Sequence, residues 1–260
     1  MFKILKKENQ NSSSKIQKSF QEQADSQGMP LIYSEEDSSD VFSKRYEELR
    51  ERGFRVYYIP FIDNNGGPCV PYNFLTFLNN FYLPPGAGRQ PRFDEDDRTI
   101  EIIVDNIEYC FLDDYVVDGN DYYKKLIMHN LRKSLKAVVK KSSVHLDYSN
   151  LLDDFPEDRS VGNYTAPDLK ILNKFKEEVL SPLNGMYIRS SKEFPEISRT
   201  NIANIISRKV AIFIQPPRKE IHSKGWIMSN CIYNIFKEHL LLFLDKAMGE
   251  HFLYASDTKI

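Results

Sequence analysis

The sequence predicts an α+β domain, an irregular mixture of helices and strands in which small sheets are packed by helices, preceded by a polar disordered tail. The chain of 260 residues is 41% hydrophobic and 28% charged, which is typical of globular proteins. Residues 41–260 interleave helix and strand patterns without the regular alternation of a doubly wound sheet. Residues 1–40 carry few apolar side chains. We therefore expect a tail over 1–40 and a single domain over 41–260.

The expected tail is rich in Ser, Gln and Asn, and its charges are segregated. Lysines dominate residues 1–20, whereas residues 21–40 hold acids and no base. Such a segment buries too little apolar surface to offset the conformational entropy that it would lose on ordering. We therefore expect it to pack little against the domain.

The first part of the domain shows a helix, a strand and a second helix in succession. Residues 41–52 combine helical spacing with good helix formers, and Gly53 is placed to end that helix. Residues 54–62 are rich in aromatic and β-branched residues and predict a strand, which Pro60 favours at a sheet edge. Residues 72–83 predict a short buried helix that two prolines stop.

The middle of the domain predicts an acidic hairpin followed by a basic helix. Residues 99–104 and 107–112 are rich in β-branched residues, and the intervening Asp-Asn pair suits a tight turn. Residues 121–142 place apolar side chains at helical spacing, with lysines and an arginine between them. Asn120 or Asp121 is a candidate cap for this helix.

The last part of the domain predicts a helix over 167–180, a short helix ending near 207, an inner strand over 210–214 and a final helix over 226–247. A shared core is expected to contain apolar residues from the hairpin, the basic helix, the inner strand and the final helix: Phe111, Leu131, Leu135, Val138, Ile212, Ile214, Ile235 and Leu242.

Charge is strongly segregated in the middle of the chain. Acids outnumber bases eleven to one over residues 94–121, whereas residues 122–146 carry seven bases and no acid. In one interpretation the helix packs on the hairpin and the charges pair within the domain. In the other, the helix presents its basic face to a polyanion such as RNA, DNA or anionic lipid. The candidate polyanion-binding residues are Lys125, Arg132, Lys133, Lys136 and Lys140.

We favour a non-enzymatic interaction or assembly protein that binds a macromolecular partner through the basic helix at 122–146. A protein partner is the first expectation, and a nucleic acid or an anionic membrane surface is the alternative. A glycine-rich loop with two arginines offers a further candidate anion site, at Gly86, Gly88, Arg89 and Arg92.

The rival hypothesis is a metal-dependent, nuclease-like enzyme that processes phosphodiesters with clustered carboxylates. A Pro-Asp-Leu-Lys segment after residue 166 partly matches a nuclease motif, and the acidic hairpin could contribute further carboxylates. The candidate catalytic residues are Asp94, Asp96, Glu101, Asp168 and Lys170.

Neither a resident metal nor an organic cofactor is expected, because the five histidines lack ligand spacing and no phosphate-binding glycine motif occurs. Three dispersed cysteines argue for a reducing compartment, cytoplasmic or nuclear. The chain has no apolar run near the 18 residues that a membrane-spanning helix needs.

Overall fold

A parallel five-stranded sheet lies at one end of the computed structural model. The structure describes residues 4–5, 31–34, 38–81, 98–116, 120–140, 146–156, 164–195, 209–218, 223–248 and 253–256. The strand order is β1-β5-β2-β4-β3, and each neighbouring pair is parallel. The strands are β1 (Ile4–Leu5), β2 (Leu31–Ser34), β3 (Arg55–Pro60), β4 (Val210–Gln215) and β5 (Leu253–Ser256). Mixed helix and strand content confirms the α+β expectation.

The predicted inner strand and edge strand are both confirmed. Strand β4 lies between β2 and β3, and its run from Val210 to Ile214 is buried on both faces. Strand β3 is at the edge of the sheet, where Pro60 removes no ladder hydrogen bond to a further strand.

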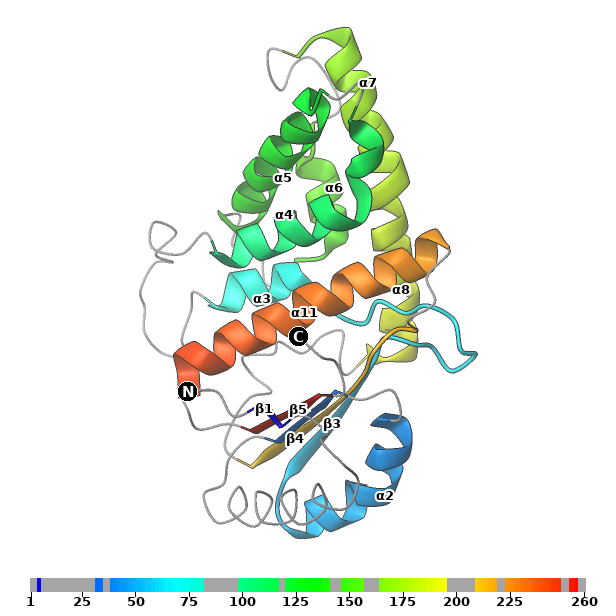
Figure 1. The fold of residues 1–260 in the computed structure, drawn as a ribbon, viewed down its shortest axis with the longest axis vertical. Helices are drawn as coiled ribbons and strands as arrows, with labels where there is room; N and C mark the ends of the chain where they lie inside the picture. Colours follow the sequence, from blue (N-terminus) through cyan, green and yellow to red (C-terminus); the bar gives the residue numbers. More distant parts are fainter. Residues whose placement is uncertain are drawn as a thin grey trace.

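The two faces of the sheet are covered by different helices, as Figure 1 shows. Helix α2 (Ser38–Glu51) packs on one face, and it ends before Gly53, whose φ of 81° suits a left-handed cap. Its cluster with the sheet contains Leu31, Tyr33, Leu49, Phe54, Ala211 and Phe213. Helix α11 (Lys224–Met248) covers the opposite face, which carries Ile32, Ile212 and Ile214.

The remaining helices of the described residues come from the chain between β3 and β4. They are α3 (Phe74–Phe81), α4 (Arg98–Phe111), the 3₁₀ turn η1 (Asp113–Tyr115), α5 (Tyr122–Lys140), α6 (Tyr148–Asp154), α7 (Ala166–Phe175), the π segment η3 (Lys176–Leu180) and α8 (Ser181–Glu193). Most of them stack beyond α11, away from the sheet, whereas the end of α8 reaches the loop that follows β3 (Figure 1). We call this group the helical insertion. One hydrophobic cluster joins it to the sheet, so the described residues form a single compact region.

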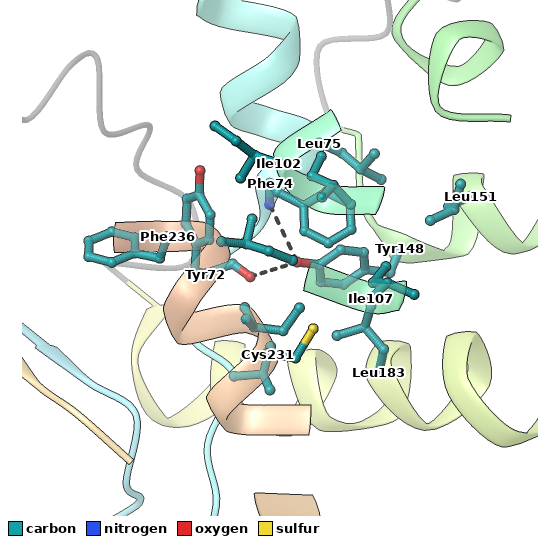
Figure 2. Packing of buried hydrophobic residues seen from close by; sticks show 14 of the residues in the cluster. Tyr72, Phe74, Leu75, Ile102, Ile107, Tyr148, Leu151, Leu183, Cys231 and Phe236 are labelled. Carbon is teal, nitrogen blue, oxygen red and sulfur yellow. Dashed lines mark hydrogen bonds between the residues drawn. The ribbon is translucent and has the colours of Figure 1, made fainter. Parts of the chain in front are cut away.

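The centre of that cluster is aromatic and contains internally bonded polar groups (Figure 2). The Tyr148 hydroxyl donates to the Tyr72 carbonyl at 2.8 Å and accepts from the Phe74 amide at 3.3 Å. The rings of Tyr148 and Phe74 meet edge to face at 4.8 Å. The expected core is largely confirmed, since Leu131, Leu135, Val138, Ile212, Ile214, Ile235 and Leu242 are buried and Phe111 is half-buried.

The predicted hairpin at 99–112 is wrong, because these residues form helix α4. Ile100, Ile103, Val104 and Ile107 recur at helical spacing and are all buried. Burial of this stripe outweighs the weak β-preference of branched side chains. The Asn106 side chain, expected in the turn, donates to the Ile102 carbonyl one helical turn earlier.

The folded part begins earlier than the expected boundary at residue 40. Strands β1 and β2 and the start of α2 come from the predicted tail, and Leu31, Ile32 and Tyr33 are buried. The apolar stretch of β2 covers only three residues, Leu31 to Tyr33, so its polar neighbours hide it in a composition average. The rest of the predicted tail lies outside the described residues.

The helix predicted over 167–180 continues to Glu193 through the π segment η3. Pro182 follows this segment at the start of α8, where a wider turn accommodates a residue that has no amide hydrogen.

Helices α5 and α11 match the predictions for 121–142 and 226–247. The short helix expected near 207 lies outside the described residues. Among the described helices, none combines the length and the hydropathy needed to cross a membrane.

Candidate functional site

The connections of β2 and β4 diverge at the carboxyl edge of the sheet. The chain continues from β2 to α2 on one face, and it continues from β4 to α11 on the other. These strands are hydrogen-bonded neighbours, with Ser34 paired to Ile214. In open parallel sheets, this divergence places a ligand crevice outside the strand ends. We call the surrounding residues the sheet-edge site: Ser34, Tyr58, Gln215, Arg218, Trp226 and Tyr233.

Polar side chains extend from both faces of this edge. Ser34 and Tyr233 are buried on the α11 side, and their hydroxyl oxygens lie 2.9 Å apart. On the α2 side, the Tyr58 hydroxyl donates to the Gln215 side-chain oxygen. Tertiary contacts therefore fix the orientation of the polar groups at the ends of β2 and β4.

The loop after β3 is held in place by a serine from α11. The Ser229 hydroxyl lies 2.9 Å from the Phe61 carbonyl and 2.8 Å from the Cys69 carbonyl. At the tip of the loop, Asp63 accepts from the Gly67 amide at 2.7 Å. A β-carbon at Gly67 would approach this carboxylate to 2.8 Å, so a larger residue there would displace the Asp63 side chain. The same α11 that bounds the site thus anchors the loop beside it.

Cationic groups gather where β4 leads into α11. The Arg218 guanidinium lies 5.7 Å from the centre of the Trp226 ring, which is a cation–π distance. Arg218 and Lys224 are exposed, and α11 begins at Lys224. A helix amino terminus carries partial positive charge and unpaired amides, so this part of the edge favours an anion. Asp63 and Glu193, which accepts from the Asn64 amide, add negative charge on the β3 side.

The basic helix is partly neutralised by α4. The Arg132 guanidinium binds the Glu101 carboxylate in a bidentate arrangement, at 2.6 to 2.9 Å, and this carboxylate raises the pKa of Arg132. Lys124 contacts Glu108 at 3.0 Å. The interpretation in which acids and bases pair within the domain therefore holds for these residues.

The other candidate polyanion-binding residues differ in their surroundings. Lys125 pairs with Asp121 one turn earlier at 2.9 Å, and both are exposed. Lys133 is exposed and Lys136 is half-buried. Lys140 is the last residue of α5, and its side chain is outside the described part of the structure.

The candidate catalytic residues Glu101 and Asp168 lie apart. Asp168 forms a capping box with Thr165 at the start of α7, and these hydrogen bonds lower its pKa. The Asp168 carboxylate also accepts a hydrogen bond from the Tyr122 hydroxyl at 3.2 Å. Tyr122 precedes Arg132, the residue that binds Glu101, by ten residues on α5. Ten helical residues span about 15 Å. Lys170 is exposed on α7.

Within the described residues, no group of three or more His, Cys, Asp or Glu side chains could hold a metal ion. Asp94 and Asp96, and the candidate anion loop of Gly86, Gly88, Arg89 and Arg92, lie outside those residues. Glu101 and Asp168 thus have structural partners, and the described residues bring no metal-binding group of carboxylates together.

The sequence pointed away from Ser34, because it lies in the polar segment expected to be disordered. Tyr233 lies among the apolar residues of the final helix, and no sequence pattern distinguished it from them. Its role became visible only when the fold placed Ser34 opposite it. The run of two prolines and basic residues after β4 was the one available indication of this edge, because Arg218 belongs to it. No family model, curated protein or solved structure matches this chain.

Proposed function

We propose that this protein binds a small anionic ligand at the sheet-edge site. The observation that carries the proposal is the divergence of α2 and α11 from the adjacent strands β2 and β4. This arrangement locates ligand sites in parallel sheets of unrelated function, so it indicates a place rather than a reaction.

The chemistry at this edge favours a polar ligand with at least one negative group. Arg218 and Lys224 are exposed beside the amino terminus of a 25-residue helix. Trp226 offers an aromatic surface next to the guanidinium. Such a combination suits a phosphate or carboxylate attached to a planar group, as in a nucleotide.

A thermal-shift titration with inorganic phosphate, AMP, ADP and a nicotinamide dinucleotide tests the proposal. We expect at least one of these anions to raise Tm in proportion to the logarithm of its concentration. Arg218→Glu should abolish the shift, because it reverses the charge where the anion is expected. Lys133→Glu makes the same charge change on exposed α5 and should leave the shift intact. Equal shifts in both variants, or none in the wild type, would overturn the proposal.

A second candidate function is the binding of an acidic macromolecule by the exposed side of α5. The specific observation that favours it is that α5 has no acidic residue, while Lys133 remains exposed. The pairing of Arg132 and Lys124 with α4 reduces the charge available to such a partner. This candidate keeps the protein, nucleic-acid and membrane-surface alternatives for the basic helix.

The same two variants separate the candidates. Binding of duplex DNA, single-stranded RNA or anionic vesicles through α5 should weaken steeply with salt. Lys133→Glu should reduce it, whereas Arg218→Glu should not. If the wild type binds none of these polyanions at low salt, the basic helix either binds a protein or has only a structural role.

A further inference from the structure

Two cysteines meet where α4 packs on α11. The His239 ring contacts the Thr99 carbonyl at 2.9 Å, which fixes the first turn of α4 against the later part of α11. Cys110 lies three turns further along α4, and Cys231 lies about two turns back toward the start of α11. The two helices therefore run in opposite directions, which brings the two thiols close enough to shift each other's pKa.

The two thiols have different surroundings. Cys231 is fully buried in the core, where Figure 2 shows it near Ile107 and Leu183. Cys110 is half-buried in the last turn of α4. The hydrogen bond from Cys231 lowers the pKa of Cys110, whereas burial raises the pKa of Cys231. Because the thiolate is the nucleophile, Cys110 is the thiol that reacts first.

We propose that Cys110 and Cys231 form a redox-reactive dithiol, which a peroxide oxidises to a disulfide between α4 and α11. The Cys110 thiolate attacks one peroxide oxygen, the O–O bond breaks, and the second oxygen leaves as water after taking a proton. The resulting sulfenic acid is then attacked by the Cys231 sulfur, which loses its proton as the S–S bond forms and a second water leaves. Two thiols and one hydrogen peroxide thus give one disulfide and two waters.

The bond would join the helical insertion to the helix that covers the sheet. Helix α4 belongs to the insertion, and α11 begins at the sheet edge.

The third cysteine provides an internal comparison. Cys69 is buried, its thiol lies 3.1 Å from the Ser190 hydroxyl, and burial raises its pKa to about 12. It is therefore expected to remain a thiol when the pair oxidises.

Peptide mapping of the full chain after treatment with hydrogen peroxide tests this proposal. Free thiols are blocked with an alkylating reagent before trypsin digestion. We expect a linked species that joins peptide 99–124, which contains Cys110, to peptide 225–237, which contains Cys231. Cys69 should be alkylated, and dithiothreitol should separate the linked peptides.

Matched variants keep the test decisive if one substitution disturbs the core. In Cys231→Ser, Cys110 should stop at the sulfenic acid, which dimedone labels. In Cys110→Ser, Cys231 should remain alkylatable. Cys69→Ser should leave the link unchanged. Full alkylation of all three cysteines in the treated wild type would overturn the proposal, as would a link that forms only between separate chains.

Discussion

At the scale of single residues, buried polar side chains join segments that are distant in the chain. His239 is fully buried between the Thr99 carbonyl and the Tyr72 hydroxyl, at 2.9 and 3.0 Å. Because a carbonyl can only accept, the Nε2 of His239 carries the proton and Nδ1 accepts from Tyr72. The neutral ring is thus fully hydrogen-bonded, and a second proton would disrupt this arrangement.

This environment predicts a loss of stability in mild acid. Burial lowers the pKa of His239 to about 4 from an ordinary 6.5, so the unfolded chain binds this proton more readily than the folded one. The free energy of unfolding should therefore fall as pH drops from 6.5 to 4, by up to about 3 kcal/mol from this group. Urea titrations across this range measure the slope. His239→Gln should flatten it, and His129→Gln, at an exposed position, should not. An unchanged slope in His239→Gln would contradict the assignment.

Among the elements, the periodicity of hydrophobic residues predicted helices well where the apolar residues formed a single stripe. The stripe of Leu131, Leu135 and Val138 predicted α5, and all three residues are buried. Helix α4 was missed because its apolar stripe consists of isoleucine and valine, which favour strands. The Asp-Asn pair in the middle of its sequence also suggested the turn of a hairpin. The charge segregation was visible in the sequence, but which acid meets which base depends on how α4 crosses α5.

The α4–α5 contact predicts energetic coupling between Glu101 and Arg132. Their bidentate pair is half-buried, so a double-mutant cycle with alanine at each position should give ~1 kcal/mol of coupling. The exposed pair of Asp121 and Lys125 is the control, and solvent screening should make its coupling smaller. Chemical denaturation of the single and double variants measures both values. Coupling at Glu101 and Arg132 no larger than in the control would contradict a structural role for this ion pair.

At the scale of the whole molecule, the sheet is assembled from strands that are far apart in sequence. Ile32 pairs with Ile212, and most of the helices that the structure describes lie in the chain between β3 and β4. Local sequence patterns predicted β3 and β4 but not the strands that they pair with. Parallel strands are not joined by a short turn, so the sequence contains no turn motif that links the partners. The candidate site shares this origin, since Ser34 and Tyr233 meet only after β2 enters the sheet.

Hydrogen–deuterium exchange tests whether the carboxyl edge of this sheet binds a small anion, as proposed. Exchange is measured by mass spectrometry with and without the phosphate or nucleotide that raises Tm most. We predict that protection concentrates in the segments around the sheet edge, at residues 61–70, 209–218 and 223–233. Protection confined to α5, or spread evenly over the chain with no local maximum at this edge, would contradict the claim.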